Sequence, residues 1–189
     1  MENTETVFTL EPNFKIVDLP ISKNRAETNV RYPLLPPYAF AHIFWDENHK
    51  ELIYHVVEPV LTESEKEILR LVTLALEEMI NISAVKAEKA NMVIKYLEKN
   101  VQSILIELGT KVSKDTYLKM MYYVFRNSVG LNRIEPLLKD YYIEDIECNG
   151  LNFPIYIVHR KFENLKTNIT FTEPQEVTDF VEKLAQKCG

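Results

Sequence analysis

The tripeptide His159-Arg160-Lys161 offers the side chains best suited to binding a charged ligand. It closes a predicted strand, so we expect it at the strand end and in the loop that follows. Arginine presents a planar fork of donors that matches phosphate oxygens. Phosphate binding needs several convergent donors, however, and an exposed basic loop without a ligand is the alternative interpretation.

Three carboxylates, Glu144, Asp145 and Glu147, follow each other along another predicted strand. Alternation would turn Asp145 and Glu147 to one face and Glu144 to the other. General acid–base chemistry needs a pocket that separates the pKa values of two such groups, and the sequence indicates none. A solvated strand face is therefore the first interpretation. A small enzyme that uses Glu144, Asp145 and His159 is a rival, and it predicts one concave pocket that holds all three.

Histidines and cysteines do not form a recognisable metal motif. His42 and His55 could approach each other across a predicted hairpin, but a zinc site needs three or four ligands. Cys148 and Cys188 are not part of a CxxC pair, so we interpret them as reduced thiols of a cytosolic protein. We expect this chain to hold no metal and no cofactor.

The glycines do not build a nucleotide loop. A P-loop reads GxxxxGK[ST], because its backbone amides surround the phosphates and its lysine pairs with their charge. The four glycines, Gly109, Gly130, Gly150 and Gly189, fit neither the spacing nor the following lysine. The sequence therefore predicts that this chain does not hydrolyse ATP by itself.

The overall charge argues against nucleic acid as a partner. The chain has 28 acidic and 22 basic residues, a net charge of −6 and a pI near 5.3. Phosphate-driven binding normally needs a basic patch. The N-terminus lacks a signal-peptide pattern, and no run reaches the roughly 18 apolar residues of a membrane span. We expect a cytoplasmic protein whose membrane role, if any, is peripheral.

The first half of the chain predicts an arm, two strands and three helices. Residues 1–31 are mostly polar and form the arm, and the proline-rich stretch 32–38 is a stiff connector. Strands are expected at 39–46 and 51–57, with a hairpin turn between them. Capping residues then delimit three neighbouring helices, and short connections predict that these helices form a bundle. The predicted caps are Thr62 with Glu65, Ser83 with Gly109, and Ser113 with Gly130.

The second half predicts a small sheet and one helix. Strands are expected at 143–149, 154–159 and 165–169. A last helix follows, with Thr172 as N-cap, Pro174 in the first turn and Gln175 at the third position. Its predicted buried face consists of Val177, Phe180, Val181 and Leu184. The fold class is α+β, with a strand pair and three-helix bundle over 32–140 and a small sheet subdomain with one packed helix over 141–189. Such a thin subdomain is either incomplete or leans on the bundle.

Four stretches in this order resemble the N-terminal region of archaeal secretion-type ATPases, the relatives of type II secretion and type IV pilus ATPases. They cover residues 32–39, 54–61, 130–150 and 154–160. The run that contains IEPLLKD and IEDIECNG is the most specific of the four. Leu131-Asn132-Arg133 departs from the pattern, because the relatives often carry a second glycine there.

The resemblance implies a function as one part of a larger machine. A C-terminal RecA-like core would bind ATP and Mg, and the full-length protein would form a hexamer. The N-terminal domain would then contact its own ATPase core, neighbouring subunits and a membrane platform protein at the cytoplasmic face. By position in the motif, Arg160 and with it His159 would contact a nucleotide in trans. Both the archaellum motor and a pilus-assembly ATPase fit this pattern.

A stand-alone helical adaptor is the alternative function. It predicts a stable chain without an ATPase continuation, in which the bundle grips partner helices. Without an ATPase ring, we expect the chain to be a monomer or a weak dimer.

Overall fold

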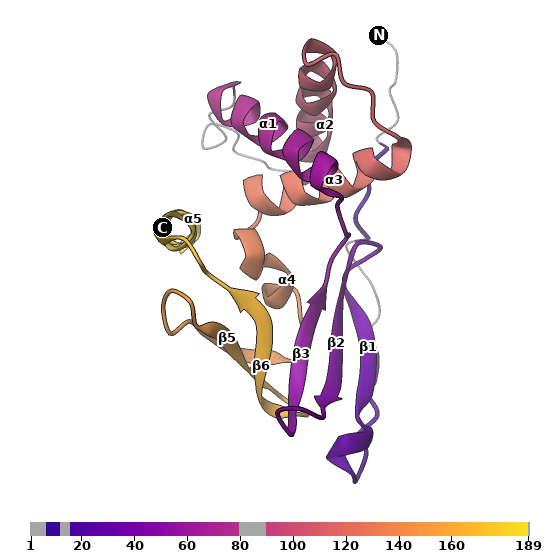
Figure 1. The fold of residues 1–189 in the computed structure, drawn as a ribbon, viewed down its shortest axis with the longest axis vertical. Coiled ribbons are helices and arrows are strands. Elements are labelled where there is room, and N and C mark those ends of the chain that lie inside the picture. The colour runs from indigo at the N-terminus through magenta and orange to yellow at the C-terminus, as the bar shows by residue number, and fades with distance from the viewer. Residues whose placement is uncertain (1–6, 12–15, 80–89, 189) are drawn as a thin grey trace. The chain divides into compact units, whose positions relative to one another are not determined.

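The computed structural model describes residues 7–11, 16–79 and 90–188, and it confirms an α+β fold (Figure 1). The chain divides into two units. A helical unit comprises Met1–Thr9 and Pro59–Gly130, and a sheet unit comprises Leu10–Glu58 and Leu131–Gly189. The chain therefore passes from one unit to the other three times. Each unit is described by itself below.

Six strands of the sheet unit form one sheet in the order β1-β2-β3-β6-β5-β4 (Figure 1). Strands β1 (Asn29–Leu35), β2 (Ala39–Asp46) and β3 (Glu51–Val57) form an antiparallel meander. The predicted hairpin 39–46/51–57 is confirmed to the residue. Along β2 and β3 buried side chains alternate with more exposed ones, because successive side chains point to opposite faces of a sheet.

Strand β1 was not predicted, because its proline-rich sequence favours a connector. Pro33 lies inside this strand. Proline lacks a backbone N–H and is tolerated on a strand that pairs on one side only, and β1 is the edge of the sheet. The sheet therefore does not need the backbone N–H that Pro33 lacks.

The second antiparallel group consists of β4 (Ile143–Glu147), β5 (Pro154–His159) and β6 (Glu163–Thr170). It joins the first group through a parallel pairing of β3 with β6, in which Ile53 faces Lys166 and Tyr54 faces Thr167. The amide of Asn168 extends this pairing. Its oxygen accepts from Val56 N at 2.8 Å and its nitrogen donates to Val56 O at 3.1 Å, as a backbone group would.

The joined sheet divides the chain differently from the predicted ranges 32–140 and 141–189. Strands from both ranges share one sheet, and the three long helices between them form the other unit. The predicted boundary failed because it depends on a pairing between strands that are far apart in the sequence. Strands β3 and β6 lie about a hundred residues apart, and neither sequence contains a local signal that they pair.

Two further helices belong to the sheet unit. Helix α4 (Glu135–Leu138) follows a 3₁₀ turn at Asn132–Ile134, and neither was predicted. Helix α5 (Pro174–Cys188) begins where Pro174 predicts it. Glu176 rather than Gln175 satisfies its first turn, since the Glu176 carboxylate accepts from Thr172 N at 2.9 Å and Glu173 N at 3.3 Å.

The helical unit contains α1 (Glu63–Met79), α2 (Ala90–Glu107) and α3 (Lys114–Ser128). Thr62 and Glu65 form the predicted reciprocal cap, with Thr62 N donating to Glu65 Oε2 at 2.8 Å and Glu65 N donating to Thr62 Oγ1 at 3.3 Å. Ser113 caps α3 through Thr116 N at 3.1 Å. Gly109 follows α2 with a positive φ of 62°. The predicted cap Ser83 lies outside the described residues.

Part of the predicted N-terminal arm is anchored within the helical unit. Glu98 of α2 is buried, and its Oε1 accepts from Val7 N at 3.0 Å and from Phe8 N at 2.7 Å. The Phe8 side chain is 1% exposed, and its ring lies 6.2 Å from that of Phe125. A carboxylate that receives two backbone donors in a dry site forms charge-assisted hydrogen bonds, which are stronger than neutral ones. Glu98 therefore fixes the described beginning of the chain.

Candidate functional site

His159 is the last residue of β5, and the structure places it in the core of the sheet unit. Side chains along β5 alternate between half-buried and buried, and His159 falls on the buried side with 1% exposure. Both ring nitrogens are engaged: Nδ1 accepts from Lys161 N at 3.2 Å, and Nε2 lies 3.1 Å from Tyr32 Oη. This corrects the expectation of a ligand-contacting histidine, because strand alternation turns the ring inward.

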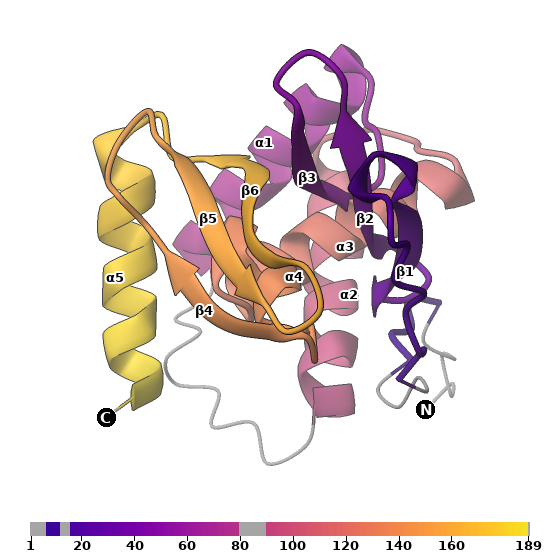
Figure 2. The same cartoon turned by 90° about the horizontal axis from the view of Figure 1, so that it is seen from below.

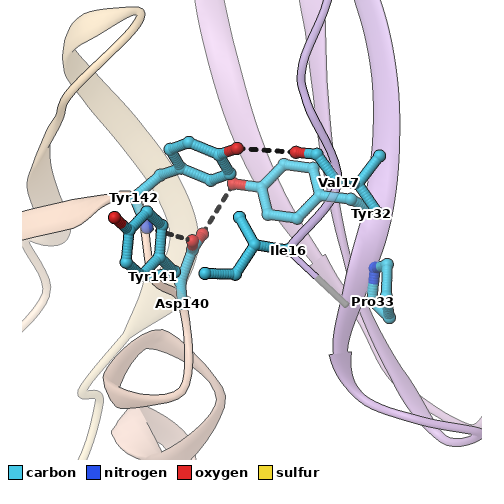
Figure 3. A pocket seen from close by; sticks show the side chains of 7 residues that line it. All are labelled: Ile16, Val17, Tyr32, Pro33, Asp140, Tyr141 and Tyr142. Atoms are coloured by element: carbon cyan, nitrogen blue, oxygen red, sulfur yellow. Dashed lines mark hydrogen bonds between the residues drawn. The ribbon is translucent and has the colours of Figure 1, made fainter. Parts of the chain in front are cut away.

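Asp140 is the centre of the buried polar group to which His159 belongs. Its Oδ2 accepts from Tyr32 Oη at 2.6 Å and from Tyr54 Oη at 2.7 Å, and its Oδ1 accepts from Tyr142 N at 2.8 Å. Figure 3 shows the Tyr32 hydroxyl pointing at this carboxylate, whereas the Tyr142 hydroxyl points at Val17 and its backbone nitrogen faces Asp140. We call Asp140, Tyr32, Tyr54, His159 and Tyr142 the Asp140 cluster. It ties β1, β3 and β5 to the segment that enters β4.

The proton positions around His159 follow from the backbone N–H of Lys161, which can act only as a donor. Lys161 N–H points at Nδ1, so the neutral His159 ring carries its proton on Nε2 and donates to Tyr32. Tyr32 in turn donates to Asp140. Burial lowers the pKa of His159 to about 4, against the opposing charge of Asp140. The ring is therefore neutral at pH 7.

The two phenols also keep their protons. Burial, and next to it the charge of Asp140, raises the pKa of Tyr32 and Tyr54. Every donor in this chain of hydrogen bonds has an acceptor. A fully satisfied network of this kind specifies a unique core rather than offering a reactive group.

A small cavity beside the cluster does not change this conclusion. Its volume is about 20 Å³, and Figure 3 shows it between the 16–17 segment, β1 and residues 140–142. Tyr142 Oη closes one side by donating to Val17 O at 2.6 Å. The space is sufficient for about one water molecule and far below the roughly 300 Å³ of a ligand pocket.

The side chains of Arg160 and Lys161 have partners other than the buried His159 ring. The Arg160 side chain is 44% exposed, with its Nε 3.4 Å from Glu144 Oε1 and its guanidinium 4.8 Å from the centre of the Tyr141 ring. Lys161 pairs with Asp18 and donates to Leu19 O at 3.2 Å. The structure therefore separates the two predicted contact residues: Arg160 reaches solvent and His159 does not.

The three carboxylates lie on β4, which is the edge of the sheet opposite β1. Glu144, Asp145 and Glu147 are all exposed. A groove of about 460 Å³ runs beside this strand, and its walls are mainly apolar. His159 is not part of the walls, so this groove does not bring together the three side chains that the rival enzyme requires. The lining residues are Leu131, Ile134, Leu137, Leu138, Asp140, Ile143, Glu144, Asp145, Ile146, Cys148, Phe180 and Leu184.

Helix α5 runs alongside β4 in Figure 2. Its residues Phe180 and Leu184 form the far wall of this groove, and none of the α5 residues is buried. Val181 is 54% exposed and Leu184 is 39% exposed. The predicted buried face of α5 is therefore wrong for this chain. The helix has the expected amphipathic pattern, but the described residues cover its apolar stripe only in part: Val177 and Phe180 are half-buried, whereas Val181 and Leu184 are exposed.

The remaining candidates do not form a site. His42 and His55 face each other in the register of β2 and β3, as the hairpin predicts. Among the residues that the structure describes, no three His, Cys, Asp or Glu side chains are grouped to hold a metal ion. Cys148 and Cys188 are both exposed thiols. None of the described helices is long and apolar enough to cross a bilayer.

Reasoning from the sequence missed Asp140 and its two phenol partners. The partners Tyr54 and Tyr32 lie 86 and 108 residues away from Asp140 in the chain. No spacing rule connects positions that far apart. The available signal was an acidic residue at the end of the apolar run Leu137-Leu138, immediately before two tyrosines.

Comparison with known proteins finds relatives in one archaeon and no matching family profile. The chain is 32% identical over 147 residues to an uncharacterized protein of Methanocaldococcus jannaschii, an alignment that covers 78% of this chain and 58% of the relative. It is 26% identical over 207 aligned positions to a second uncharacterized protein of that organism, over 100% of this chain and 37% of the relative. The chain thus spans somewhat over half of one relative's length and somewhat over a third of the other's.

Proposed function

We propose that this chain is a docking and coupling domain: the N-terminal regulatory part of a hexameric secretion-type ATPase that powers an archaeal surface filament. The observation that carries the docking role is the apolar groove of about 460 Å³ between β4 and a helix with no buried residue. An apolar surface of this kind marks an interaction site more often than a solvated face. The Asp140 cluster keeps the sheet that presents the groove in one arrangement.

The assignment to a secretion-type ATPase is supported by the sequence. The resembling stretches, with residues 167–169 after the fourth, cover about residues 32 to 189 in the family's order. The relatives are archaeal, and most of the second one lies outside its match to this chain. In this proposal a further domain supplies the ATP and Mg site, because the present sequence contains no P-loop motif. The domain would act in the cytoplasm, at the membrane face, against a platform protein.

Arg160 is the residue that we propose to contact a neighbouring subunit's nucleotide. Its guanidinium is partly exposed, and its ionic partner is the exposed Glu144 at 3.4 Å. An exposed ion pair of this kind contributes little and can be exchanged for a phosphate at small cost. His159 is not part of this contact. It instead fixes the end of β5, from which Arg160 projects.

The experiment begins with the full-length gene product. Reading the gene beyond codon 189 should reveal a P-loop, and the 189-residue chain alone should not turn over ATP. In the full-length protein, Arg160→Ala should lower ATP hydrolysis by about a hundredfold, the low end of the effect of a charge-stabilising group. Arg25→Ala is the matched control, since Arg25 is also exposed and pairs with Glu163 at 3.5 Å. Equal kinetics for both variants would remove Arg160 from the mechanism.

A helical adaptor is the second candidate, and exposed apolar side chains on α2 favour it. Met92 is 66% exposed and Ile106 is 79% exposed. A partner helix could bury them. A gene that ends without an ATPase core would decide for this candidate.

A further inference from the structure

Strand β4 is a free edge of the sheet with an apolar wall beside it. In the described chain β4 is hydrogen-bonded to β5 and is the last strand in the sheet order, so its outer N–H and C=O groups point away from the ladder. One β4 amide, Ile146 N, already donates to Asp145 Oδ1 at 2.9 Å. The groove of about 460 Å³ begins at the side chains of Ile143 and Ile146 and ends at Leu184 of α5. Main-chain donors and acceptors next to an apolar wall are the two components that bind an added strand.

The way in which α5 is attached keeps this space open. Four of its residues, at i, i+4, i+7 and i+11, hold α5 in place: three contact the segment before β4, and one contacts Phe171, which follows β6. The contacts are Glu176 with Arg133 at 3.1 Å, Phe180 with Phe171 at 5.8 Å between ring centres, Lys183 with Asn132 at 2.7 Å, and Lys187 with Glu135 at 3.9 Å. The stripe of Val177, Val181 and Leu184 lies roughly 100° around the helix from that line, because each residue advances the helix by about 100°. Val181 and Leu184 of this stripe are exposed, and Val177 is half-buried.

The charges on β4 determine which strand can be added. Glu144, Asp145 and Glu147 project from the edge, and Arg160 compensates only the first of them. A second copy of this chain would bring the same three carboxylates opposite their own counterparts, which is unfavourable. Acidic side chains on an edge also discourage unspecific pairing. They favour a strand that carries lysine or arginine.

We propose that the β4 edge binds a basic, extended segment of a partner protein, whose backbone pairs with β4 and whose alternate apolar side chains enter the groove. This proposal rests on the docking role given above and specifies its partner. The partner strand alternates Val, Ile or Leu with Lys or Arg over about five residues, the length of β4. The groove takes the apolar side chains, and Glu147, which is exposed and is not among the lining residues, faces a basic one.

The test uses the intact 189-residue chain and labelled peptides, with fluorescence anisotropy at about 0.15 M salt, where distant charges are screened. The probe is a ten-residue peptide that alternates valine with lysine. Two matched peptides differ in one respect each: one has glutamate in place of lysine, and the other is N-methylated at every second residue. We expect the basic peptide to bind and both matched peptides to bind at least about tenfold more weakly, since one lacks the charge and the other lacks the donors.

Two protein variants complete the test. Glu147→Lys should weaken the basic peptide about fivefold, the effect of one exposed charge pair. Leu184→Gln should weaken it by a similar factor by making the wall polar. Glu107→Lys, an exposed reversal in the helical unit, should leave binding unchanged. The proposal is overturned if the basic peptide does not bind, if N-methylation has no effect, or if Glu107→Lys acts as strongly as Glu147→Lys. None of these outcomes depends on whether an ATPase core follows in the gene.

Discussion

The buried His159 ring should make the stability of this protein depend on pH in a predictable way. Burial lowers the pKa of His159 from 6.5 to about 4 in the folded protein. In the unfolded chain His159 therefore becomes protonated below pH 6.5, whereas in the folded chain it becomes protonated only below about pH 4. Folding is linked to the neutral ring, so the contribution of His159 is fully present above pH 6.5 and is lost as the pH falls.

The size of this loss follows from the two pKa values. With these two pKa values, the free energy of unfolding falls by about 2 kcal/mol between pH 8 and pH 5. The loss reaches about 3 kcal/mol near pH 4, where it levels off. Structure supports the sign independently. A protonated ring would carry a hydrogen on Nδ1, which faces Lys161 N–H at 3.2 Å, and two donors cannot share that position.

The measurement is urea unfolding of the wild type and of His159→Gln at several pH values. Glutamine can still donate to Tyr32 but does not titrate. At pH 8 the variant should be less stable, because Lys161 N–H loses its acceptor. The difference in the free energy of unfolding between the two proteins should narrow by about 2 kcal/mol on going to pH 5, since only the wild type has a buried group that must stay unprotonated.

Two further variants serve as controls. Tyr54→Phe destabilises the same cluster but keeps His159, so its stability curve should run parallel to that of the wild type. His159→Asn is a second non-titrating substitution in case the glutamine variant does not fold. Parallel curves for wild type and both His159 variants between pH 8 and pH 5 would refute the reasoning.

The other predictions concern single contacts, each measured by urea unfolding. Tyr54→Phe removes one of the donors to the buried Asp140 carboxylate and should cost about 1–3 kcal/mol, whereas Tyr141→Phe, a change to an exposed phenol, should cost little. Glu98→Ala should cost about 1–3 kcal/mol and make the chain cleavable near Phe8, because two backbone donors lose their acceptor; unchanged protease resistance would contradict this anchor. Thr62→Ala should cost about 1 kcal/mol through loss of the α1 cap, and a Thr62→Ser variant should retain most of it.

The local elements could be predicted because their causes lie within a few residues. Alternating β-branched and aromatic residues define β2 and β3, and their ends are observed where the sequence predicts them. Thr62 and Ser113 start helices because a side-chain oxygen of each accepts from the amide three positions ahead. Glycine spacing is also a local feature, and it is sufficient to recognise that the sequence contains no P-loop motif.

Tertiary structure alone decided which elements belong together and which side chains meet. The parallel pairing of β3 with β6 overrides the boundary predicted at residue 140, since backbone pairing has no sequence code at that separation. The Asp140 cluster is formed by residues up to 108 positions apart, and it turns His159 from a surface candidate into a core residue. Periodicity identified the apolar stripe of α5 correctly, but whether a stripe is covered depends on what packs against it, and that is a property of the assembled surface.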